Sequence, residues 1–151
     1  MRTAFVWLIV LTIAAGAAAQ EAGDAKPAQR YGIAADLKTY PQSTPKETLA
    51  SVLKAIDAKR IDYLLAHLAD PQFVDRRVAE NGGRFDILLQ EAKAKLLDDP
   101  GTAKQLRRFL NEGEWTIDAN AASVRLKDVS DHQVFLRQLG GRWFMENRRK
   151  P

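Results

Sequence analysis

The sequence predicts an α+β fold in which N-terminal helices pack on one face of a curved antiparallel β-sheet of about four to five strands. Apolar residues recur every three or four positions, the helical period, through most of residues 44–112. After Gly113 the period changes to two, which is typical of half-buried strands. Because helical and strand segments are segregated along the chain rather than alternating, we expect an antiparallel sheet.

The first predicted helix begins after Thr44. The Thr44 hydroxyl can accept a hydrogen bond from free backbone amides, Pro45 suits the first helical position, and Glu47 completes a capping box. One apolar stripe follows along this helix, formed by Leu49, Val52, Leu53 and Ile56. The folded domain is therefore expected to begin at about residue 44.

A second helix is predicted from its own apolar stripe, formed by Ile61, Leu64, Leu65 and Leu68. The two stripes are out of step across residues 57–60, which predicts a kink or a break there. Pro71 prevents the second helix from continuing and disfavours helical geometry at Asp70. Residues 72–78 (QFVDRRV) show a partial alternation of apolar residues, from which we predict a short strand.

Two more helices are predicted before the sheet. Residues 80–83 (ENGG) indicate a turn, and residues 84–97 form an amphipathic helix. Its apolar side consists of Phe85, Leu88, Leu89, Ala92 and Leu96. Residues 98–101 (DDPG) break this helix, and a shorter one over residues 102–112 ends at Gly113.

Four segments after Gly113 have the pattern of strands: residues 114–118, 122–128, 132–139 and 142–147. Gly140 and Gly141 separate the last two segments and match a tight hairpin turn. In the last strand, alternation places Trp143 or Phe144 in the core in either register.

Residues 1–19 predict a cleaved secretory signal peptide. Arg2 supplies the positive end, residues 4–15 form an apolar run too short to span a bilayer comfortably, and small residues precede Gln20. The alternative is an uncleaved membrane anchor. Cleavage before Gln20 would make the mature protein secreted or periplasmic, without a membrane span.

The remaining boundaries follow from composition. Residues 20–43 lack a sustained apolar period and are predicted to be a flexible leader, so the domain spans residues 44–148, and residues 149–151 form a basic tail. The absence of cysteine excludes disulfides, a lipoprotein anchor and thiolate metal sites. The net charge is +4, which is mild, and export separates the protein from most nucleic acid, so nucleic-acid binding is not expected.

Two stretches carry a resemblance to a known family. "TLASVLKAIDAKRIDYLLAHLADPQFVDRRV" resembles the opening pattern, and "VFLRQLGGRWFMEN" the closing hairpin, of the nuclear-transport-factor-2-like superfamily, which includes ketosteroid isomerase and SnoaL-like cyclases. The resemblance covers residues 44–148 and implies a cone-shaped α+β fold. That fold hosts enzymes, transport factors and binding domains alike, so the resemblance alone does not imply one function.

The resemblance argues against isomerase chemistry. It places the catalytic tyrosine near Val52 and the general-base aspartate near Arg76, with Asp75 one position away. Valine cannot donate a proton to an oxyanion, and arginine cannot abstract one at neutral pH. An enzyme of this type would have to use Asp75, Tyr63 or His67 as acid/base groups.

The favoured hypothesis is a secreted or periplasmic, non-enzymatic domain that binds a small apolar ligand or a protein partner through its cone or its sheet face. The pocket candidates are Leu53, Tyr63, His67, Phe73, Phe85, Trp115 and Trp143. The alternatives are the enzyme described above and a homodimeric scaffold. His67 and His132 are the only histidines and lack partners at ligand spacing, so neither a metal nor another cofactor is expected.

Overall fold

The computed structural model describes residues 26–148. The predicted signal peptide (residues 1–19), the start at Gln20 and the basic tail (residues 149–151) lie outside the described residues. Within residues 26–148, none of the helices combines the length and the apolar character needed to cross a bilayer.

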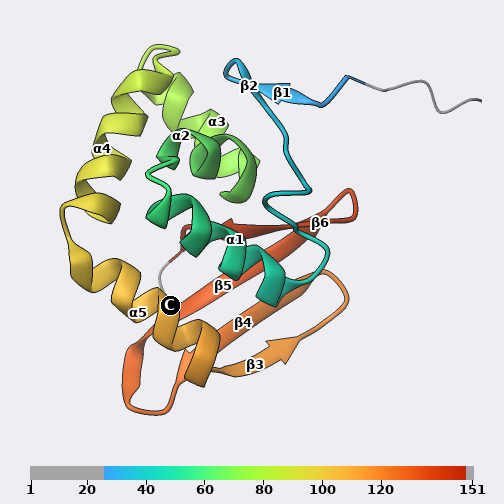
Figure 1. The fold of residues 1–151 in the computed structure, drawn as a ribbon, viewed down its shortest axis with the longest axis vertical. Coiled ribbons are helices and arrows are strands. Elements are labelled where there is room, and N and C mark those ends of the chain that lie inside the picture. The colour runs from blue at the N-terminus through green and yellow to red at the C-terminus, as the bar shows by residue number, and fades with distance from the viewer. Residues whose placement is uncertain (1–25, 149–151) are drawn as a thin grey trace, which may run out of the picture.

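Helices occupy the first part of the domain and strands the second (Figure 1). The helical elements are α1 (Pro45–Asp57), α2 (Ile61–Tyr63), the π-helical segment η1 (Leu64–Leu68), α3 (Pro71–Glu80), α4 (Phe85–Leu97) and α5 (Pro100–Glu112). The strands are β1 (Gln29–Arg30), β2 (Ile33–Ala34), β3 (Glu114–Ile117), β4 (Ala121–Leu126), β5 (Val129–Leu139) and β6 (Arg142–Glu146).

The last four strands form one antiparallel sheet in the order β3-β4-β5-β6, whereas β1 and β2 form a separate hairpin. The predicted α+β class and the four-stranded antiparallel sheet are therefore confirmed. Gly140 (φ 55°) and Gly141 (φ 77°) form the turn between β5 and β6, as their spacing predicted. Both have positive φ, which glycine adopts without steric cost.

The start of α1 agrees with the predicted capping box. The Thr44 side chain accepts a hydrogen bond from the Glu47 backbone N–H at 3.1 Å. The Glu47 carboxylate accepts one in return from the Ser43 N–H, also at 3.1 Å. The predicted break between the first two helices is present as well, and Lys59 within it has a φ of 57°.

The predicted strand over residues 72–78 is wrong, because this segment lies within α3. Pro71 occupies the first turn of α3, and the Asp70 carboxylate caps it by accepting a hydrogen bond from the Gln72 N–H at 3.0 Å. The buried Val74 and Val78 are four residues apart, which is a helical spacing. Asp70-Pro71 therefore ends one helix and starts the next.

The predicted leader boundary at residue 43 also needs correction. Residues 29–34 form the β1–β2 hairpin, and Tyr40 and Gln42 are buried. The Gln42 side-chain amide donates hydrogen bonds to the carbonyl oxygens of His67 (2.9 Å) and Trp143 (2.6 Å), so it joins η1 to β6. The folded domain therefore begins before Thr44, near the start of β1.

Helices α1 and α5 lie across one face of the sheet (Figure 1), with α1 against β6 and α5 against β4. Between them the core buries Leu49, Phe109 and Val124, and a neighbouring cluster buries Leu136 and Trp143. The prediction that Trp143 or Phe144 belongs to the core is confirmed for both. The other helices, η1, α3 and α4, extend beyond the β6 edge and form a second part of the core.

Candidate functional site

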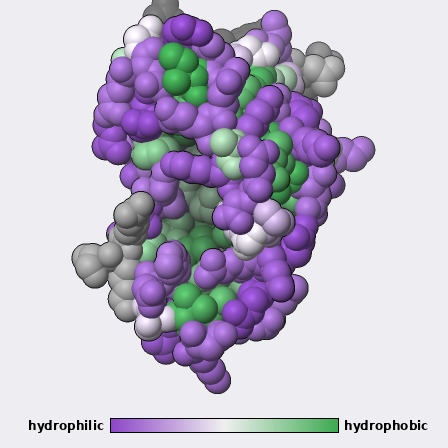
Figure 2. All heavy atoms as spheres, turned by 90° about the vertical axis from the view of Figure 1, so that its left-hand side faces the viewer, coloured by the Kyte–Doolittle hydropathy of each residue, from purple (hydrophilic) through white to green (hydrophobic). Residues whose placement is uncertain are grey.

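A groove of about 810 Å³ opens where α3, α4 and the end of β6 meet. Figure 2 faces this side of the molecule and shows a hollow with apolar residues on its floor and hydrophilic residues around it. Apolar clefts of several hundred cubic ångströms are typical small-molecule sites. The groove is therefore the candidate functional site.

The floor of the groove is apolar and comes from η1, α3, α4 and β6. It consists of Leu64, Leu65, Ala69, Phe73, Leu88, Ala92, Leu96 and Met145. Leu88, Ala92 and Leu96 are four residues apart and therefore lie on one face of α4. The sequence predicted this stripe as a core-facing side, but part of it lines the groove.

Charged side chains border the floor, and most of them form ion pairs. The Arg77 guanidinium donates to Glu91 at 2.9 Å and to Glu80 at 3.2 Å. These two hydrogen bonds raise the pKa of Arg77. Glu146 pairs with Arg148 at 2.6 Å. Arg77 therefore serves two carboxylates, and Glu146 has a cationic partner of its own.

Asp99 is also engaged, because it caps α5. Its carboxylate accepts hydrogen bonds from the Gly101 N–H at 2.9 Å and from the Thr102 hydroxyl at 3.2 Å. Lys95 differs from the other charged residues that line the groove, since its ammonium forms no ion pair with any part of residues 26–148. Among the charged side chains that line the groove, Lys95 is thus the one without a bonded partner in residues 26–148.

Most polar groups that line the groove are already bonded. No histidine lines it, and its carboxylates already bind arginines or backbone amides. Across residues 26–148 the structure also contains no cluster of three or more histidine, aspartate or glutamate side chains arranged to hold a metal ion. The arrangement is suited to binding an apolar molecule.

Of the predicted pocket residues, Phe73 lines the groove and the other six do not. Leu53 is buried on α1, and Phe85 stacks on Tyr31 with ring centroids 4.4 Å apart. Trp143 is buried with Ala122 and Leu136, and Trp115 packs against this cluster. The predicted pocket set is therefore distributed among separate parts of the core.

Tyr63 and His67 lie together, with ring centroids 5.0 Å apart, but beneath the segment that carries β1 and β2. The His67 Nε2 lies 2.8 Å from the Ile33 carbonyl oxygen, so the neutral ring donates from Nε2, and the buried Nδ1 has no hydrogen-bond partner. Burial lowers the pKa of His67. The Tyr63 hydroxyl accepts a hydrogen bond from the Asp36 N–H at 2.9 Å.

Asp75 is engaged by the same N-terminal segment. Its carboxylate accepts hydrogen bonds from the Arg30 guanidinium at 2.5 Å and from the Tyr31 hydroxyl at 2.6 Å. Burial acts to raise the pKa of Asp75, but these two hydrogen bonds outweigh it and hold the pKa below its ordinary value. The three alternative acid/base residues are thus each bonded to the N-terminal segment, and none lines the groove.

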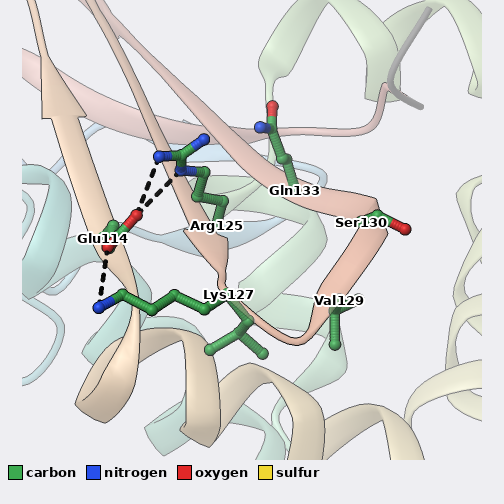
Figure 3. Close-up of a pocket in the computed structure, with 7 residues that line it drawn as sticks. Glu114, Arg125, Lys127, Val129, Ser130 and Gln133 are labelled. Carbon is green, nitrogen blue, oxygen red and sulfur yellow. Dashed lines mark hydrogen bonds and ion pairs between the residues drawn. The ribbon is translucent and has the colours of Figure 1, made fainter.

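A second, smaller hollow of about 460 Å³ lies on the sheet, where Figure 3 shows its lining. The Glu114 carboxylate binds Arg125 at 3.0 Å and Lys127 at 3.4 Å, and the Ser130 hydroxyl points away from these three side chains. These ion pairs lower the pKa of Glu114, which is accessible to solvent. Only Leu126 and Val129 in its lining are apolar, so this hollow is a weaker candidate for an apolar ligand.

Comparisons with known proteins identify no relative of this chain. No family model matches the sequence, no curated protein matches it, and no solved structure matches the fold.

Proposed function

We propose that this protein is a non-enzymatic binding domain that takes an apolar molecule into the groove between α3, α4 and β6. The observation that carries the proposal is an apolar floor whose bordering carboxylates are already bonded. Apolar surface in a concave site is stabilised when a ligand displaces water from it. The bordering carboxylates are engaged by arginines or backbone amides, which disfavours a role for them in proton transfer.

The proposal can be tested by filling the groove. Ala92→Trp places a large ring against the floor, whereas Ala94→Trp places the same ring on the exposed side of α4 and serves as the matched control. We expect the wild type and Ala94→Trp to bind a neutral apolar dye such as Nile red, and Ala92→Trp to lose at least tenfold in affinity. Equal dye binding by both tryptophan variants would contradict the proposal.

We also propose that the fold is of the nuclear-transport-factor-2-like type and that the protein is exported. The support for the fold is the capped α1, the second helix with its break, and the closing Gly140-Gly141 hairpin. The helix α3 departs from the strand that the resemblance implies after Pro71. Export rests on the sequence of residues 1–19, and N-terminal sequencing of the secreted protein would test cleavage before Gln20.

A further inference from the structure

The charge on Lys95 restricts the chemistry of the ligand. Lys95 projects from the same side of α4 as Ala92 and Leu96, and it lines the groove. Arg77, Glu91 and the other charged lining groups are occupied by partners, as described above. Of the charged groups in the lining, the Lys95 ammonium is therefore the one left free to bind the polar end of an apolar ligand.

We infer that the natural ligand is a single-chain amphiphile with a terminal carboxylate, an inference that rests on the proposed function. The apolar chain lies on the floor formed by residues such as Phe73 and Met145, and the carboxylate binds the Lys95 ammonium. Lys95 is exposed to solvent, so this attraction is modest. A long lysine side chain can adjust to the position of the carboxylate without moving α4.

Geometry and charge both disfavour other ligand classes. The stretch of α4 from Leu88 to Lys95 spans about 10 Å at the helical rise, so the part of an extended apolar chain nearest the carboxylate can lie along it. A cationic amphiphile would meet the unpaired Lys95, and its most direct acidic partner, Glu91, already binds Arg77. A carboxylate can bind the unpaired Lys95 directly.

The test compares dodecanoate with its methyl ester, which has the same chain and no charge. Both are titrated at pH 7.4 below their aggregation concentrations, with displacement of Nile red as the measurement. We expect the wild type to bind dodecanoate about fivefold more tightly than the ester, as an exposed ion pair allows. The preference should shrink at high salt, because salt screens the charge.

Two lysine variants locate the effect. Lys95→Gln should bind both compounds with equal affinity, whereas Lys93→Gln, which removes an exposed charge from another side of α4, should keep the wild-type preference. Loss of the preference in both variants, or in neither, would overturn the inference.

The remaining outcomes separate this inference from the proposed function. If the wild type binds the ester and dodecanoate equally and Ala92→Trp abolishes both, the carboxylate inference fails while the proposed function stands. If neither compound nor Nile red binds, both fail. If neither binds and Ala92→Trp changes the sedimentation of the protein, the groove is an interface between two copies of this chain, and the inference is overturned.

Discussion

His67 is a buried histidine held neutral by its surroundings. Its Nε2 donates to the Ile33 carbonyl oxygen, its Nδ1 has no partner, and the cations of Arg142 and Arg30 add to the burial that lowers its pKa. Protonation would place an unsatisfied charge beneath the β1–β2 hairpin. The neutral form of His67 therefore stabilises the packing of the β1–β2 hairpin over it at neutral pH.

We predict that the free energy of unfolding falls as the pH is lowered from 7.5 to 5. In the unfolded chain the pKa of His67 is about 6.5, whereas in the folded state it is lower, so below pH 6.5 the unfolded state binds more protons. The contribution is fully present above pH 6.5 and declines as the pH falls toward the folded-state pKa. Urea unfolding at several pH values measures it.

His67→Gln is the control for this prediction. The glutamine amide can still donate toward Ile33 but does not titrate, so the variant should lose less stability than the wild type over the same pH range. Identical pH profiles for the two proteins would show that His67 does not titrate in the way proposed.

The start of α3 depends on one carboxylate that has two functions. Asp70 caps the helix through the Gln72 N–H and also binds Arg137 on β5 at 2.8 Å. Both side chains of the Asp70–Arg137 pair are mostly buried. The pair therefore connects the helix to the sheet as well as ending the preceding helical segment.

We predict that Asp70→Ala lowers the free energy of unfolding by about 2–4 kcal/mol, because it removes a helix cap and leaves Arg137 without its partner. The matched variant Asp99→Ala removes an exposed cap from α5 and should cost about 1 kcal/mol. Thermal or urea unfolding gives both values. A smaller effect at Asp70 than at Asp99 would contradict the role assigned to the ion pair.

The elements that could be predicted have strong local signals. Thr44, Pro45 and Glu47 define the start of α1, and Gly140-Gly141 defines the last hairpin, because caps and tight turns depend on neighbouring residues. Asp70-Pro71 is also a cap signal, but from the sequence it predicts only the end of the second helix. Its second function, starting α3, was missed because the partial alternation in residues 72–78 favoured a strand.

Other features depend on contacts between distant residues and have no periodic pattern. Gln42 is buried because two carbonyl groups far along the chain accept its hydrogen bonds, and a polar residue in a Pro- and Gly-rich segment gives no sign of this. The candidate site is a similar case. Phe73 was predicted, but Ala69 and Met145 reach the groove only because the η1 end pairs with β6.

At the scale of the whole molecule, the sheet and its two covering helices form one part of the core, and η1, α3 and α4 form another beyond the β6 edge. The groove lies where these two parts meet, as ligand sites often do at the junction of packed units. We propose that the ligand binds in this groove and not in the sheet hollow at Glu114.

The most direct test is to map the site by the backbone amide chemical shifts of the ¹⁵N-labelled protein during titration with methyl dodecanoate. We predict that the largest shifts occur at Phe73, Ala92, Leu96 and Met145, around the groove. Shifts centred on Glu114, Arg125 and Gln133, around the sheet hollow, or no saturable shifts at all, would contradict the account.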